Sequence, residues 1–244
     1  MNAMRDIPLK SVGYDHNDPM LKTGDEGLTV WALQDMARKK RFEELDGLFN
    51  NGVTMNALPV GMCAGAAARV FDTDNKLISE LLHYITGKNW RGKVFFRSKN
   101  TAVSQGRNRI RESVLIPNSR IVPMAKFDTM LLDSHPLAPH AKSSVVVLNY
   151  FDPLTRPYLQ ERLVSKVPVF DVQVAVPGKY GPVYIGKTWL GKYAKNREFT
   201  ATDPNKLIAR YFLDFNPEAV KEQKEEHWDG SEEDVLDPLP EIDN

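Results

Sequence analysis

Asn89-Trp90-Arg91-Gly92-Lys93-Val94-Phe95-Phe96 is the stretch that decides the fold, and Gly106-Arg107-Asn108-Arg109-Ile110 follows it closely. Both stretches alternate apolar residues with large basic ones, which predicts two neighbouring β-strands. Successive residues of a strand face opposite sides, so Lys93 shares a face with Arg91 and Phe95. The other face then carries Trp90, Gly92, Val94 and Phe96. If the lysine face points into a barrel, it lines a ligand pocket; if it points to water, the strand is an ordinary one.

The β pattern continues through most of the chain. Strands are predicted at 90–97, 103–113, 121–132, 143–151, 164–176, 183–190 and 207–215, separated by turn clusters such as Pro177-Gly178-Lys179. A run rich in small residues at 57–71 brings the count to eight. Helical periodicity is confined to 28–50 and 72–87, which argues against the helix–strand alternation of a parallel sheet. We therefore predict a mainly β fold, an eight-stranded antiparallel barrel wide enough for one small ligand.

Composition and charge set the broad class. The chain has 244 residues, 42% hydrophobic and 26% charged, with a net charge of zero, as is usual for a globular protein. The sequence has no apolar run long enough to span a bilayer and no apolar leader near Met1. Cys63 is the single cysteine, so an intrachain disulfide is excluded. Together these features predict a cytoplasmic protein.

Three parts are expected along the chain. Residues 1–56 form an N-terminal arm and helix, residues 57–216 form the barrel domain, and residues 217–244 form an acidic tail. The last part holds eleven acidic residues and only two lysines. Such a segment buries little apolar surface, so we expect it to be disordered.

The common catalytic and binding motifs are missing from the sequence. It contains no Walker phosphate loop, no Gly-x-Gly-x-x-Gly after a strand and no Gly-x-Ser-x-Gly. One cysteine and five scattered histidines predict no metal site. The basic run at 107–111 lacks the aromatic spacing of an RNA-binding sheet. We expect no cofactor, no nucleic acid and no membrane span, while a homodimer stays open.

Polar residues in otherwise apolar strands are the candidate site residues. The clearest are Lys93, Asn108, Asn149, Tyr150 and Asp171. Alternation puts Asp171 on one face of its strand and a purely apolar set on the other. Either the apolar face packs against the core and Asp171 meets water, or helices cover the apolar face and Asp171 points into the barrel.

A lumenal Lys93 would need Asp171 as its partner, because an unpaired buried charge is very costly. A buried lysine has a lowered pKa and a paired carboxylate can act as a base, which suits proton abstraction or Schiff-base chemistry. On this hypothesis the catalytic residues are Lys93, Asp171 and Tyr184. The ligand-binding residues are Arg91, Phe95, Asn108, Asn149, Tyr150 and Gln173. The alternative for each is a strand-edge polar group or a structural ion pair.

Short motifs occur in the predicted strands and turns. They are Trp90–Phe95, Gly106–Arg109, Val147-Leu148-Asn149-Tyr150, Pro177-Gly178-Lys179-Tyr180 and Tyr184-Ile185-Gly186. Together they resemble a little-described bacterial family of lipocalin-like, calycin-type barrels. The resemblance spans about residues 58–215. It implies a closed lipocalin-like barrel with a hydrophobic pocket. The N-terminal helical segment and the acidic tail lie outside the resemblance, and the short inserted helix is predicted from the periodicity at 72–87. The strand before the Pro-Gly turn carries a single carboxylate, Asp171, where the family pattern is more charged. A two-carboxylate mechanism is therefore not expected.

Three functions are weighed. The first is a barrel that binds a small hydrophobic or aromatic molecule, such as a lipid, an isoprenoid or an aromatic catabolite. The second is a cofactor-independent lyase, isomerase or cyclase that uses Lys93 or Asp171 as a base, with Tyr184 or Asn108 for orientation. The third is an interaction module without a ligand. The fold alone does not choose between them.

Overall fold

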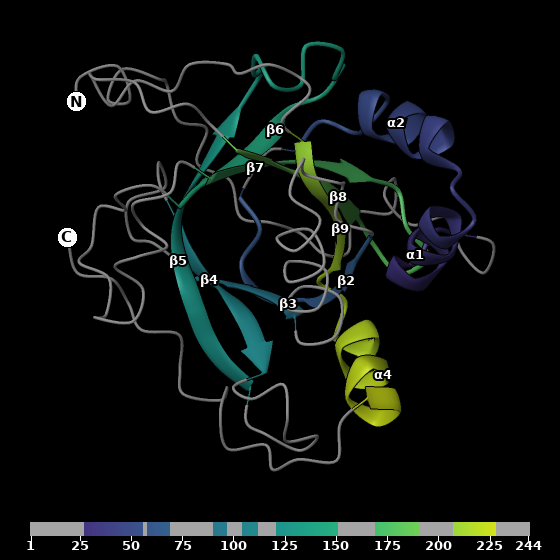
Figure 1. Ribbon diagram of the computed structural model, residues 1–244, viewed down its shortest axis with the longest axis vertical. Coiled ribbons are helices and arrows are strands. Elements are labelled where there is room, and N and C mark those ends of the chain that lie inside the picture. The colour runs from purple at the N-terminus through teal and green to yellow at the C-terminus, as the bar shows by residue number, and fades with distance from the viewer. Residues whose placement is uncertain are drawn as a thin grey trace.

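The computed structural model describes residues 27–55, 58–68, 90–96, 104–111, 121–150, 169–190 and 207–227. Their centre is a nine-stranded antiparallel sheet with strand order β1-β3-β4-β5-β6-β7-β8-β9-β2 (Figure 1). The strands are β1 (Gly61–Met62), β2 (Ala64–Ala67), β3 (Trp90–Phe95), β4 (Ser104–Arg111), β5 (Ile121–Leu132), β6 (Val145–Asn149), β7 (Val169–Val176), β8 (Val183–Leu190) and β9 (Leu207–Asp214). The helices are α1 (Val30–Arg38), α2 (Phe42–Asn50) and α4 (Pro217–His227).

The two ends of the sheet meet at Cys63. Strand β1 pairs with β3, and β2, which starts one residue after Cys63, pairs with β9. The amide of Cys63 donates to the carbonyl of Lys93 at 3.0 Å, so the run stays attached to β3 while it turns toward β9. The sheet is thereby a nearly closed barrel.

The prediction of a mainly β barrel is confirmed, but the strand count is nine and not eight. The predicted run at 57–71 is divided at Cys63 into two short strands because each half pairs with a different end of the sheet. The backbones of Gly65 and Gly92 approach each other so closely there that a Cβ on either would overlap the other strand. The predicted bounds 121–132 and 183–190 are those observed, whereas the predicted strands 143–151 and 207–215 include the described residues 143, 144, 150 and 215, which lie outside β6 and β9.

Helices α1 and α2 cover the outer face of the barrel beside β7 to β9 (Figure 1). The predicted helix in 28–50 is two helices, and Lys40, between them, has a positive φ of 59°. Val172, Val174 and Val176 pack with the helices in an outer apolar cluster. Asp171 and its alternate neighbours on β7 therefore face the lumen, which decides between the two orientations considered from the sequence.

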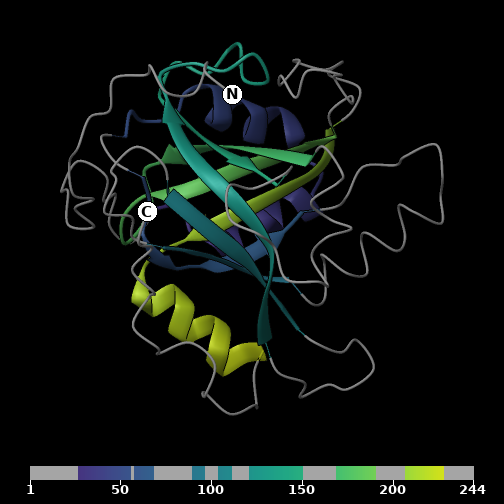
Figure 2. The same ribbon diagram turned by 90° about the vertical axis from the view of Figure 1, so that its left-hand side faces the viewer.

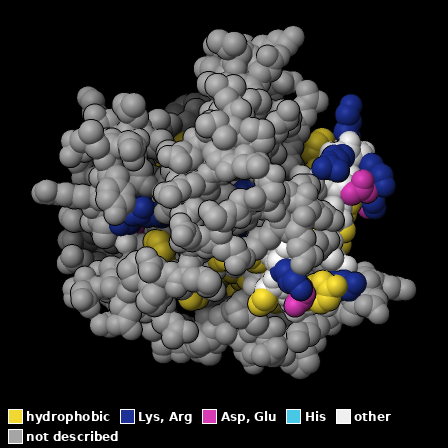
Figure 3. Space-filling model, turned by 90° about the horizontal axis from the view of Figure 1, so that it is seen from below, with side chains coloured by type: hydrophobic (Ala, Val, Ile, Leu, Met, Phe, Trp, Pro, Cys, Tyr) yellow, Lys and Arg dark blue, Asp and Glu magenta, His cyan; other side chains and the backbone are white. Residues whose placement is uncertain are grey.

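One ion-pair group fastens α2 to the outside of the barrel. Asp46 lies 2.9 Å from the Lys187 ammonium and 2.8 Å from the Arg210 guanidinium. Burial of Asp46 opposes its ionisation, but the hydrogen bonds from Lys187 and Arg210 outweigh that effect and lower the pKa of Asp46. In the view from below, the described charged side chains that reach the surface include both basic and acidic types (Figure 3).

Helix α4 corrects the predicted disordered tail at 217–244. Its residues 217–227 are helical and lie at the lower end of the sheet in both ribbon views (Figures 1 and 2). Ala219 and Val220 pack against Ala64, and the amide of Gln223 donates to the carbonyl of Gly65 at 2.9 Å. The rest of the tail, most of the N-terminal arm and the predicted helix at 72–87 lie outside the described residues.

Candidate functional site

A closed hydrogen-bonded network lies inside the barrel around the ammonium group of Lys93. Its Nζ donates to Asn108 Oδ1 at 2.8 Å, to Asp171 Oδ2 at 2.9 Å and to the hydroxyl of Tyr150. An ammonium group has three protons, so all three are used. The exposed fractions of the Lys93 and Asp171 side chains are 3% and 2%, so the pair is shielded from bulk solvent.

The partners of Lys93 also bond to one another. The hydroxyl of Tyr150 donates to Asp171 Oδ2 at 2.7 Å, and Asn108 Nδ2 donates to that hydroxyl at 3.3 Å. The indole Nε1 of Trp90 donates to Asn108 Oδ1 at 2.9 Å. The four strands β3, β4, β6 and β7 or their immediate ends thus supply one continuous network.

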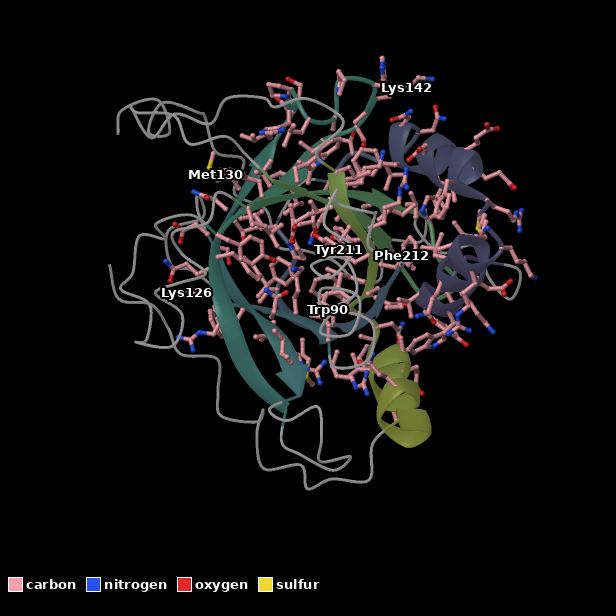
Figure 4. The ribbon with its side chains drawn as sticks, in the orientation of Figure 1. Trp90, Lys126, Met130, Lys142, Tyr211 and Phe212 are labelled. Atoms are coloured by element: carbon pink, nitrogen blue, oxygen red, sulfur yellow. The ribbon has the colours of Figure 1, made fainter. Side chains whose placement is uncertain are left out.

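Aromatic rings enclose the ammonium group. The Lys93 Nζ lies 4.7 Å from the ring centroid of Tyr211, 5.2 Å from those of Phe127 and Tyr150, and 5.6 Å from that of Trp90. Rings at these distances attract a cation through their negative faces. Figure 4 shows Trp90 and Tyr211 inside the barrel, and their centroids are 5.5 Å apart in an edge-to-face arrangement.

Burial and the carboxylate of Asp171 set the charges of the network. Burial lowers the pKa of Lys93, and the charge of Asp171 and its hydrogen bond oppose that shift. Burial and the negative charge of Asp171 raise the pKa of Tyr150 and of Tyr211 well above 10, so both phenols stay neutral. The hydrogen bonds fit an ammonium–carboxylate pair with two neutral phenols.

A β-bulge brings Trp90 to the same side as Lys93, which corrects the predicted faces of this strand. Trp90 is opposite Ile110 and Lys93 is opposite Asn108, so β3 has one residue more than β4 between these pairs. Gly92, within the bulge, has a positive φ of 109°, which glycine adopts without strain. Simple alternation placed Trp90 on the opposite face because it assumes a regular strand.

Arg109 satisfies the backbone carbonyls at this irregular seam. Its guanidinium donates to the carbonyls of Cys63 at 3.0 Å and Arg91 at 3.1 Å. Arg109 is 3% exposed, and its burial lowers its pKa. Its neighbour Asn108 faces the lumen, so Arg109 lies on the opposite face of β4. We therefore assign Arg109 to the closure of the barrel.

Two buried acceptors on β7 face the lumen without a hydrogen-bond partner. They are Asp171 Oδ1 and Gln173 Oε1, on residues that are 1% and 0% exposed. The Gln173 amide nitrogen donates to the hydroxyl of Tyr211 at 2.7 Å. Buried polar atoms are normally hydrogen-bonded, so these two oxygens are the acceptors on the lumenal face of β7 that stay open.

The structure brings together most of the predicted site residues. Lys93, Asn108, Tyr150 and Asp171 form the network, and Gln173 joins Tyr211 beside it. Phe95 and Tyr184 belong to the lumenal apolar cluster, where Tyr184 packs edge-on against Phe215 with centroids 5.3 Å apart.

Two predicted residues stand apart from the network. The side chain of Arg91 is half-buried, and its backbone carbonyl bonds to Arg109. Asn149 lies two residues after Val147 on β6, so the two side chains face the same side of the strand. Val147 packs in the outer apolar cluster under the helices. Alternation thus puts the Asn149 side chain on the outer face, away from Asp171.

Sequence reasoning missed three lumenal aromatic residues, Trp90, Phe127 and Tyr211. Alternation within 207–215 was the available signal for Tyr211, because Tyr211 and Leu213 face the lumen while Phe212 faces the helices (Figure 4). The ring of Tyr211 lies over Gly186 of the next strand, where a Cβ would overlap it. No comparable signal existed for Trp90, because its face depends on the bulge.

Comparison of the chain with protein-family models, with curated proteins and with solved structures finds no match. The resemblance to lipocalin-like proteins therefore stays a prediction. Within the described residues, no group of three or more His, Cys, Asp or Glu side chains is arranged to hold a metal ion. None of the described helices has the length and apolar character needed to cross a membrane.

Proposed function

We propose that the barrel binds a small hydrophobic or aromatic molecule in its lumen. The observation that carries the proposal is the pair of buried, unpartnered acceptors, Asp171 Oδ1 and Gln173 Oε1, among aromatic side chains. Ligand sites typically combine an apolar wall with a few polar groups that fix the orientation of the ligand. Cys63, buried and unpaired, fits a reducing compartment, and we place the binding in the cytoplasm.

In this proposal Lys93 positions Asp171 and does not bond to the ligand. All three of its ammonium protons already have acceptors within the network. Attack on a carbonyl group would require a neutral amine with a free lone pair, and thus the loss of these bonds. The role of Lys93 is to hold one carboxylate oxygen so that the other is presented to the lumen.

Binding of the neutral fluorophore 1-aminoanthracene tests the proposal. We expect its fluorescence to rise when it enters the barrel, and Asp171→Asn and Gln173→Met to weaken its binding. Native mass spectrometry of the purified protein would show whether a ligand is carried through purification. Absence of both binding and a carried ligand would leave the interaction-module hypothesis and overturn the proposal.

Lys187→Met is the matched control for Lys93→Met. Both lysines pair with an aspartate and lie over aromatic rings, but Lys187 is on the outer face, 4.1 Å from the ring centroid of Phe49. Lumenal binding predicts that Lys93→Met weakens the binding of the fluorophore and that Lys187→Met leaves it unchanged. Equal loss in the two variants would point to a general effect on folding.

A cofactor-independent acid–base reaction is the second candidate. It rests on the same free oxygen, because a carboxylate held at Oδ2 by Lys93 and Tyr150 can accept a proton at Oδ1. The reaction class is that of a lyase, isomerase or cyclase acting on the bound molecule. Turnover of candidate aromatic compounds that is retained in Asp171→Asn would exclude this role for Asp171.

A further inference from the structure

We infer that the lumen selects its ligand through a neutral hydrogen-bond donor on an aromatic ring, a phenolic hydroxyl or an aromatic amine, and rejects carboxylates. The inference rests on the proposed binding function and narrows the class of ligand. It follows from the directions of the hydrogen bonds in the network. The N–H and O–H groups beside Asp171 already donate to other residues, whereas two buried oxygen atoms accept no hydrogen bond.

The donors beside Asp171 are committed. The Lys93 ammonium donates to Asn108, Tyr150 and Asp171. The indole N–H of Trp90 and the phenol of Tyr150 also donate within the network. The Tyr211 hydroxyl, which accepts from Gln173, has a hydrogen bond with Asp171 that contributes to its raised pKa. A ligand with only acceptors, such as an ester or a ketone, gains no bond from these groups unless one of their existing bonds breaks.

The open positions are acceptors. Asp171 Oδ1 is a carboxylate oxygen, and Gln173 Oε1 is a carbonyl oxygen two residues further along the same face of β7. The amide of Gln173 is oriented by its bond to Tyr211, so its oxygen is the free atom. Thr129 Oγ1, on the lumenal face of β5, also has no partner, but a hydroxyl donates or accepts and does not discriminate.

The distribution of charge opposes an anionic ligand. Lys93 is already paired with Asp171, so the pair presents no net positive charge. The buried guanidinium of Arg109 bonds to carbonyls at the barrel seam, and Lys187 and Arg210 bond to Asp46 outside the barrel. Among the described residues discussed above, no cation is left over to pair with a ligand carboxylate at Asp171 Oδ1, and burying such a charge is very costly.

The aromatic wall favours a ring over an alkyl chain. Phe127, Tyr150, Trp90 and Tyr211 surround the network, with ring contacts of 5.3 Å between Phe127 and Tyr150 and 5.5 Å between Trp90 and Tyr211. Edge-to-face and offset contacts with such rings add to the area that an aromatic ligand buries. A neutral hydroxyl or amino group on that ring completes the hydrogen bonding of Asp171.

The test uses two series of ligands, each with the same ring system and three different substituents. The first series is 2-naphthol, 2-methoxynaphthalene and 2-naphthoate. The second, smaller series is phenol, anisole and benzoate. Affinities are measured by calorimetry on the wild-type protein, so no variant has to fold. A bond to a carboxylate predicts that the hydroxyl compound binds about 10-fold or more tightly than its methyl ether. The carboxylate compound should bind at least as weakly as the ether.

The Gln173→Met variant removes one acceptor while keeping the length of the side chain. We expect it to weaken the binding of 2-naphthol by a larger factor than that of 2-methoxynaphthalene. Equal affinities for the hydroxyl and ether compounds, or tighter binding of 2-naphthoate, would overturn this inference while the binding function stands. If no compound of either series binds, the proposed function itself fails.

Discussion

Replacement of Lys93 by methionine is expected to destabilise the barrel strongly, because it leaves the carboxylate of Asp171 buried without its cation. The Asp171 side chain is 2% exposed, and the ammonium at 2.9 Å is its charged partner. Removal of one member of a buried ion pair costs about 3–5 kcal/mol. Methionine fills much of the space of the lysine stem, so the loss reports chiefly on the charge.

A double-mutant cycle separates the pair from the packing. The variants are Lys93→Met, Asp171→Asn and the two together, each measured by urea unfolding. In the double variant no buried charge is left unpaired, so it should be more stable than the sum of the single losses by at least about 2 kcal/mol. A coupling energy below about 0.5 kcal/mol would refute the claim that the two charges depend on each other.

The control cycle uses the pair on the outside of the barrel, with Lys187→Met and Asp46→Asn. Asp46 is 39% exposed and keeps Arg210 at 2.8 Å when Lys187 is removed. A partly exposed pair of this kind contributes about 1 kcal/mol or less. A larger coupling energy for Lys187 and Asp46 than for Lys93 and Asp171 would contradict the claim that burial in the lumen strengthens the coupling between the two charges.

Three further predictions concern pH and packing. Burial raises the pKa of Tyr211 well above 10, so the contribution of the neutral phenol to stability is present below pH 10 and is lost above it. The free energy of unfolding of the wild-type protein should therefore fall faster above pH 10 than that of Tyr211→Phe. The same dependence on pH in both proteins would contradict this. Burial lowers the pKa of His135 from 6.5 to about 4, so the free energy of unfolding should decrease as the pH falls from 6.5 to 4. His135→Gln should reduce this dependence on pH, measured by urea unfolding. An unchanged slope would count against a buried neutral imidazole. In thermal unfolding, Gly186→Ala should destabilise the protein by about 1–3 kcal/mol, because the added Cβ overlaps the Tyr211 ring. Gly47→Ala should stabilise it by about 0.5–1 kcal/mol, because Gly47 lies on helix α2 with open space around it. The reverse order of stabilities would contradict the position of the Tyr211 ring over Gly186.

The regular strands could be predicted from the sequence because alternation and turn residues determine them locally. Strand β8 ends at the bounds predicted, and the alternation in β7 correctly separated Asp171 and Gln173 from the valines that pack under the helices. The pairing of Lys93 with Asp171 followed from the cost of burying either charge alone. These inferences need only local periodicity and the energetics of burial.

The irregular parts of the barrel could not be predicted because they depend on contacts between distant segments. The bulge at Gly92 and the division at Cys63 arise where β2 must reach β9 while Cys63 stays bonded to Lys93. Helix α4 was hidden by the acidic composition of its segment, although Ala219 and Val220 give it a small apolar face. The lumenal position of Trp90 follows from the bulge and was missed with it.

The most direct test of the account is a crystal structure of the protein with 2-naphthol bound. The account predicts the naphthalene ring inside the barrel among Trp90, Tyr150 and Tyr211, with its hydroxyl group within hydrogen-bonding distance of Asp171 Oδ1 and with Lys93 still bonded to Asp171 Oδ2. A ligand bound outside the barrel, or a lumenal ligand whose hydroxyl group points away from Asp171, would contradict it.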